Sequence, residues 1–213
     1  MDDLDKLKNS WKKSTDNYPK FSAKEIYAML HKRSSSIVKW ILVISITEFT
    51  LWLVISFLLS DSSQMKRINS LHLNYITTPL EIINYLIILY FMFIFYTNYR
   101  RIKVTDNAKR LMQSILKTRK AVTTYIITVI VYNFISMMLL FVLFFMYDPN
   151  IIGAEQKFEA NGNLGWFYVL YILLALLATG VILLLFWLFY KLIYGLLLKR
   201  LNRNYNELKK LDF

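Results

Sequence analysis

The stretch IVKWILVISITEFTLWLVISFLL, residues 37–59, is almost entirely apolar and decides the fold class. A helix that crosses a bilayer needs about 20 mostly apolar residues, because the hydrocarbon core is about 30 Å thick. Inside that core each backbone N–H and C=O must be bonded within its own segment, so a spanning stretch must be helical. We therefore predict that residues 36–60 form a transmembrane helix.

Three later blocks are also long and apolar enough to span a membrane: residues 80–97, 121–147 and 164–190. The chain as a whole is 56% hydrophobic, above the roughly 45–50% of soluble domains. The blocks predict an all-α integral membrane protein with four transmembrane helices, joined by outer loops at residues 61–79 and 148–163.

The positions of the basic residues predict the topology. Nine Lys and Arg residues lie in residues 1–39, eight in residues 98–120 and six in residues 191–213. The two intervening connections hold only Lys66, Arg67 and Lys157. Because cytoplasmic connections carry the excess of Lys and Arg, we expect both termini to be cytoplasmic. Aromatic rings prefer the headgroup level, so Trp40 and Tyr190 should lie at the inner membrane boundary.

The net charge of +12 predicts contact with anionic lipid headgroups, because each well-placed Lys or Arg gains about 1 kcal/mol at such a surface. We predict no direct nucleic-acid binding, since no nucleic-acid motif accompanies the charge. A basic inner rim is formed by cations that flank the second and third predicted spans: Arg100, Arg101, Lys103, Lys117, Arg119 and Lys120.

An acid, Glu48, lies near the middle of the first predicted span. An ionised Asp at the centre of a bilayer costs roughly 2.5–3.5 kcal/mol on insertion scales, so Glu48 should be hydrogen-bonded or face a wet cavity. Asn133 and Thr179 lie at a similar depth in later spans and complete a predicted intramembrane polar layer. A bond from the Asn133 amide to Glu48 would hold two helices together. The alternative is a proton or cation site in a small transporter.

Residues 1–35 are predicted to form cytoplasmic amphipathic helices. Leu4, Leu7 and Trp11 follow helical spacing and give one apolar stripe. Ser22 and Glu25 form a capping-box pair, which predicts a second helix that continues into the first span. The stripe is the leading candidate for a surface that binds the membrane or a soluble partner.

Two more basic segments carry helical stripes of apolar residues. Residues 98–120 form a predicted basic helical connection, which Thr105 caps and which continues into the third span. Residues 191–213 form a predicted cytoplasmic amphipathic tail. A stripe without a partner is unfavourable in water. These helices should therefore pack together as a cap, lie on the inner leaflet, or bind a partner.

Three stretches resemble a family of small four-span bacterial inner-membrane proteins: LDKLKNSWKK at 4–13, YPKFSAKEIYAMLHKRSSSIVKWILVISITEF at 18–49 and VTDNAKRLMQSILKTRKAV at 104–122. Some members are encoded beside extracytoplasmic-function sigma factors. The resemblance implies an anti-sigma-like anchor in the bacterial cytoplasmic membrane, with a sigma factor as its cytosolic partner. No site residue carries over, because zinc-binding anti-sigma domains use Cys and this chain has none.

Some members of that family are labelled carotene monooxygenase. Carotenoid-cleaving oxygenases hold iron with four histidines, whereas this chain has two, His31 and His72, predicted on opposite sides of the membrane. The chain also carries no phosphate-binding loop and no nucleophile motif. We therefore predict no metal, no cofactor and no enzymatic activity.

The sequence thus predicts a non-enzymatic regulatory or scaffolding membrane protein that binds a cytosolic partner through basic amphipathic helices. A proton- or cation-coupled transporter that uses Glu48 and a structural subunit of a larger membrane complex are the alternatives. Ala175 and Thr179 are four residues apart and would allow close helix contact within the chain or in a homo-oligomer.

Overall fold

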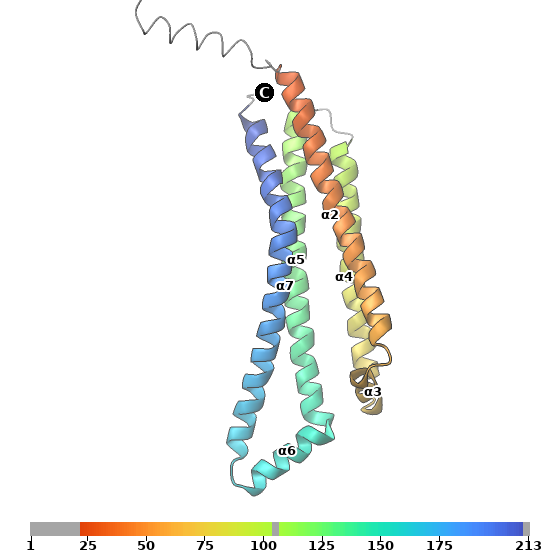
Figure 1. Ribbon diagram of the computed structural model, residues 1–213, viewed down its shortest axis with the longest axis vertical. Coiled ribbons are helices and arrows are strands. Elements are labelled where there is room, and N and C mark those ends of the chain that lie inside the picture. The colour runs from red at the N-terminus through yellow and green to blue at the C-terminus, as the bar shows by residue number, and fades with distance from the viewer. Residues whose placement is uncertain (1–21, 104–106, 211–213) are drawn as a thin grey trace, which may run out of the picture.

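The computed structural model describes residues 22–103 and 107–210. Within these ranges the chain forms α-helices and no strands, which confirms the predicted all-α class. In chain order the helices are α2 (Ala23–Leu59), α3 (Ser63–Ser70), α4 (Asn74–Lys103), α5 (Ala108–Tyr147), α6 (Pro149–Ala160) and α7 (Leu164–Lys209) (Figure 1).

The four long helices form an antiparallel bundle (Figure 1). α2 packs beside α4 and α7, and α5 packs between α4 and α7. The basic end of the bundle, at the top of Figure 1, holds the first turns of α2 and α5 and the last turns of α4 and α7. The loop end, opposite, holds the short helices α3 and α6, which lie in the two predicted outer loops.

Each long helix is long and apolar enough to cross a membrane. In the most apolar window of each helix only 11–17% of the residues are buried inside the bundle. Most apolar side chains therefore point outward, which is unfavourable in water but not in lipid. The structure has the features of a multi-pass membrane protein. The predicted spans overlap α2, α4, α5 and α7 in turn.

Packing is concentrated in the half of the bundle nearest the basic end. The buried positions of α2 recur every three or four residues: Leu30, Ser34, Val38, Ile41, Ser45 and Glu48. The buried positions of α4 repeat this spacing: Ile88, Phe91, Phe95, Asn98 and Ile102. Such spacing is typical of knobs-into-holes packing between helices. Beyond Glu48, α2 buries no further residue, so the loop-end half of the bundle is packed less tightly.

At the basic end the four long helices extend beyond the predicted spans, and these helical extensions pack against one another. One buried cluster joins all four long helices there: Leu30, Val38, Ile102, Leu111, Ile115, Leu201 and Leu208. The Asn204 side-chain amide donates to the Ser34 hydroxyl at 3.1 Å, and His31 Nε2 lies 2.7 Å from the Ile102 carbonyl oxygen. Of the arrangements predicted for the apolar stripes, mutual packing is the one that the described extensions adopt.

The start of α2 is the predicted capping box. The Glu25 N–H donates to the Ser22 hydroxyl at 3.2 Å, and the Ser22 N–H donates to the Glu25 carboxylate at 2.7 Å. The bonds from the Ser22 backbone and side chain hold the pKa of Glu25 below its usual value. The start of α5 differs from the prediction. Thr105 lies outside the described residues, and the N-cap is Asn107, whose Oδ1 accepts from the Lys109 N–H at 2.9 Å.

Candidate functional site

Glu48 is a buried acid of α2, near the middle of the first predicted span, with 6% of its surface exposed. Its Oε1 accepts a hydrogen bond from the Tyr190 hydroxyl, and its Oε2 accepts one from the Tyr194 hydroxyl at 3.3 Å. The two tyrosines lie one turn apart on α7, so their side chains share a helix face. The carboxyl of one helix is therefore held by two donors of another.

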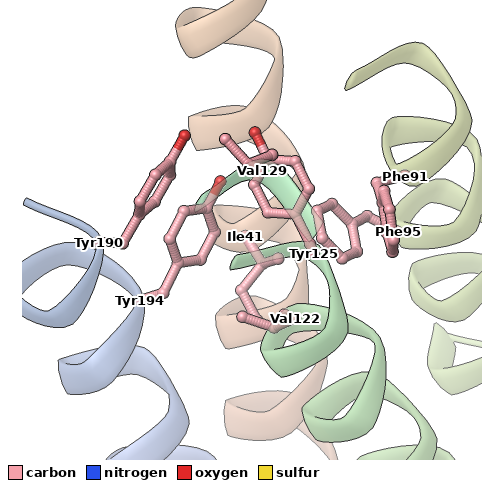
Figure 2. Close-up of a cluster of buried hydrophobic side chains, with 8 residues drawn as sticks. All are labelled: Ile41, Phe91, Phe95, Val122, Tyr125, Val129, Tyr190 and Tyr194. Atoms are coloured by element: carbon pink, nitrogen blue, oxygen red, sulfur yellow. The ribbon is translucent and has the colours of Figure 1, made fainter. Parts of the chain in front are cut away.

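Tyr125 of α5 completes a set of phenols around this carboxyl. Its ring meets those of Tyr190 and Tyr194 edge-on, with centroids 5.9 and 6.0 Å away. The ring of Phe91 of α4 is tilted against it, with a centroid distance of 5.2 Å. The three hydroxyls lie at the same end of the cluster (Figure 2). The Tyr125 hydroxyl has no hydrogen-bond partner within the described residues. It nevertheless lies close enough to Glu48 for the two groups to interact electrostatically. All four long helices thus contribute to the surroundings of Glu48.

This arrangement can stabilise a carboxyl group without bulk water. A carboxylate accepts hydrogen bonds only, and a phenol hydroxyl can donate one. Bonds to an ionised acceptor are roughly twice as strong as those between neutral groups. The Glu48 site can therefore hold α2 against α7, and its hydroxyls can also exchange a proton with the carboxyl.

Asn133 and Thr179, the other members of the predicted polar layer, do not contact Glu48. The Asn133 amide donates to the Val129 carbonyl of its own helix at 2.8 Å. The predicted Asn133–Glu48 bond is therefore wrong: the Asn133 amide donates one turn back along α5, and the Glu48 oxygens accept from Tyr190 and Tyr194. Thr179 is 1% exposed, and its hydroxyl lacks a hydrogen-bond partner in the part of the chain that the structure describes.

The phenols around Glu48 were not predicted from the sequence. Tyr190 was expected at the membrane boundary but is 2% exposed, since it points into the bundle toward Glu48. Trp40, expected at the same level, is 57% exposed, and its depth in a membrane stays a prediction. The sequence did contain a signal for this site. Tyr190 and Tyr194 are four residues apart and so lie on one face of α7, the helix that packs against Glu48 of α2.

Asn133 lines a pocket of about 170 Å³ in the loop-end half of the bundle, whose lining combines polar and apolar side chains. The pocket lies between α4 and α5, where Glu81, Asn84 and Ser136 also line it. The Tyr132 hydroxyl, at the same pocket, donates to the Leu80 carbonyl at 2.5 Å. The polar side chains in this lining can be hydrogen-bond partners for water molecules in a pocket of this size.

The predicted basic inner rim lies at the basic end of the bundle. Five of its members are exposed: Arg100, Arg101, Lys103, Lys117 and Lys120. The sixth, Arg119, is half-buried and donates to the Asn202 side-chain oxygen at 2.7 Å, which joins α5 to α7. The predicted binding stripe of Leu4, Leu7 and Trp11 lies outside the described residues.

A second buried acid, Asp148, lies at the loop end, where it is the N-cap of α6. Its Oδ1 accepts from the Asn150 N–H at 2.9 Å, and its Oδ2 pairs with the Arg67 guanidinium of α3. Burial alone would raise the pKa of Asp148, but bonds from Arg67 and from backbone N–H groups of α6 outweigh it and hold that pKa below its usual value. The pair ties together the connections at the loop end.

The two histidines lie at opposite ends of the bundle. His31 is at the basic end, against the last turn of α4, and His72 is at the loop end, between α3 and α4. In residues 22–103 and 107–210 no group of three or more His, Cys, Asp or Glu side chains is placed to hold a metal ion.

Comparison with curated proteins finds no match, and comparison with solved structures finds none. The model of a domain of unknown function, DUF8845, matches residues 24–213. The match begins in the first turn of α2 and extends beyond α7, so it includes all four long helices and the Glu48 site. The chain therefore belongs to the DUF8845 family.

Proposed function

We propose that this protein is a non-enzymatic scaffold or regulator in the membrane, whose basic end holds an acidic cytosolic partner. The supporting observation is that, at that end, apolar side chains face inward and basic side chains face outward. The inward-facing apolar side chains of the described extensions are buried against one another, and many of the outward-facing positions carry Lys or Arg. The exposed cations there include Lys24, Lys32, Arg33, Lys39, Arg100, Lys103, Lys109, Arg110, Lys117, Lys120, Lys199, Arg200, Lys209 and Lys210.

In the part of the basic end that the structure describes, the acids do little to balance these cations. Within the described extensions the acids are Glu25 and Glu207. Glu25 is engaged in the cap with Ser22, and Glu207 pairs with Arg203 at 3.0 Å. A surface of one sign on a packed helical bundle favours fast association with a partner of the opposite sign.

The orientation is part of the proposal: both termini in the cytoplasm of a bacterium, with four helices across its inner membrane. The excess of Lys and Arg at the basic end supports it. Because the chain has no cysteine, Lys117→Cys in α5 and Lys157→Cys in α6 give single labelling sites. A membrane-impermeant maleimide should label residue 157 on intact cells, and residue 117 only after permeabilisation. The reverse pattern would overturn the topology.

The proposed partner is a sigma factor of the extracytoplasmic-function class, which the resemblance of residues 4–13, 18–49 and 104–122 favours. The test is binding of the purified protein, in nanodiscs, to the sigma factor encoded nearest its gene. Lys117→Glu with Lys120→Glu should weaken binding by about tenfold or more, and added salt should weaken it further. Lys66→Glu with Lys157→Glu is the matched control, because it makes the same charge change at the loop end. Equal binding by both double variants would count against the basic end.

A small transporter is a second candidate, and the burial of Glu48 favours it. An ionisable side chain inside a span marks an ion or proton path by default. Proton-coupled uptake into vesicles should then be lost in Glu48→Gln, while the variant keeps its fold. Glu159→Gln, at an exposed acid of α6, is the control. Uptake that survives in Glu48→Gln would rule out a proton site at this carboxyl.

A further inference from the structure

A hollow of about 460 Å³ lies between α2 and α7 at the basic end. Its lining residues are Arg33, Ser36 and Ile37 of α2 and Arg200, Arg203 and Asn204 of α7. We propose that this hollow binds the headgroup phosphate of an anionic phospholipid from the adjacent leaflet. The site is separate from Glu48 and goes beyond the proposed function, and its Arg33 and Arg200 also belong to the basic surface proposed to hold the partner.

The charge of the hollow fits a phosphate. Its three arginines carry positive charge at all physiological pH values and match phosphate oxygens through paired N–H groups. Among the described residues no carboxylate forms an ion pair with Arg33 or Arg200. Arg203 pairs with Glu207 at 3.0 Å, but that arginine side chain is 80% exposed, so the pair leaves its remaining N–H donors available.

The floor of the hollow is fixed by a buried hydrogen bond. Asn204, 5% exposed, donates to Ser34, 0% exposed, at 3.1 Å. This bond joins α2 to α7 beside the hollow, because Asn204 is one of the residues that line it. A site whose supporting helices are held in this way loses little freedom when it binds a ligand.

The surface beside the hollow distinguishes a lipid from a free phosphate. Trp40 lies one turn from Ser36 on α2, and Leu196 lies one turn from Arg200 on α7, both toward the middle of the bundle. Their exposed fractions are 57% and 59%. Residues four apart share a helix face, so an apolar surface continues from the charged hollow toward the spans. A phospholipid has the same sequence of a charged group followed by an apolar one. Its phosphate would lie among the arginines, and its acyl chains would lie along Trp40 and Leu196. Basic pockets between membrane helices bind lipid headgroups in the same way.

The experiment is a lipid-binding measurement on the full chain by native mass spectrometry in detergent. The probes are phosphatidylglycerol, phosphatidylcholine and inorganic phosphate, each added in a concentration series. We expect preferential binding of phosphatidylglycerol, and a loss of about tenfold or more in Arg33→Gln with Arg200→Gln, given about 1 kcal/mol per cation at such a surface. Arg100→Gln with Arg110→Gln is the matched control, since it removes two exposed arginines outside the hollow.

Three results would overturn the lipid site. One is an equal loss in the two double variants, which would mean diffuse attraction to a basic surface. Another is equal binding of phosphatidylcholine. The third is inorganic phosphate that competes fully with phosphatidylglycerol at equal concentration, which would identify a phosphate site without a lipid. If the glutamine variant does not fold, Arg33→Lys with Arg200→Lys replaces it: reduced phosphatidylglycerol binding supports paired arginine contacts, and unchanged binding contradicts them.

Discussion

Glu48 and Tyr190 are separated by 142 residues in the chain and share a buried hydrogen bond between α2 and α7. Tyr194 donates to the same carboxyl from the next turn of α7. The contact lies where the tightly packed half of the bundle ends, because α2 buries nothing beyond Glu48. It is therefore placed to set how the α2 and α7 helices meet.

Tyr190→Phe should lower the free energy of unfolding by about 1–3 kcal/mol, because it removes a donor from a buried carboxyl. The measurement is reversible unfolding in detergent micelles. Tyr90→Phe is the matched control, since the Tyr90 side chain is 63% exposed, and it should change stability little.

The same substitution in a Glu48→Leu background tests whether the two residues act together. Once the carboxyl is absent, no buried acceptor is left unpaired, so Tyr190→Phe should then cost much less. Additive losses in the double variant would show that the hydrogen bond does not account for the effect.

Acid should destabilise the loop end through Asp148. Because its pKa is lower in the folded chain than the usual value of about 3.9, its contribution to stability is complete above that usual value. That contribution is lost as the pH falls through the lower, folded-state pKa. Melting temperatures measured between neutral pH and about pH 3 should therefore drop less steeply in Asp148→Asn than in the unaltered protein.

At neutral pH Asp148→Asn should cost about 1–3 kcal/mol, since it leaves a buried partner of Arg67 uncharged. Asp61→Asn is the control, because the side chains of Asp61 and its partner Lys66 are 89% and 65% exposed. An exposed pair of this kind contributes about 0–1 kcal/mol. Equal effects at both sites would contradict a structural role for the Arg67–Asp148 pair.

Leu111→Ala should cost about 2–5 kcal/mol, because Leu111 is fully buried in the basic-end cluster and truncation leaves a cavity. Leu116→Ala, five residues along the same helix, should cost far less, since Leu116 is 42% exposed. The comparison is made by thermal unfolding in one detergent. Similar losses for the two leucines would mean that the extension of α5 is not packed within the bundle.

Ser22→Ala should loosen the first turn of α2. It removes the acceptor for the Glu25 N–H, and loss of an N-cap side chain costs about 0.5–2 kcal/mol. Amide hydrogen exchange at residues 23–26 should accelerate while exchange near Glu48 stays slow. Ser35→Ala, at a half-buried position inside α2, is the control and should leave that first turn protected.

Local features of the sequence were sufficient for the four long helices and for the start of α2, but not for α3 and α6, which lie where outer loops were predicted. The apolar run at residues 37–59 predicts a spanning helix by its length, and Ser22 with Glu25 predicts the beginning of α2. Even where the cap was misplaced, from Thr105 to Asn107, the shift was two residues. These features depend on neighbours within one turn, which the sequence gives directly.

The sequence by itself determined the helical class, the long apolar segments and the uneven distribution of charge, because these follow from composition and spacing along one segment. Only the tertiary structure decided that Glu48 meets Tyr190 and Tyr194 and not Asn133, and that Arg33 and Arg200 share one hollow. Such contacts depend on how each helix is rotated and shifted along its neighbours. That geometry results from the packing of all four helices together, which no single segment specifies.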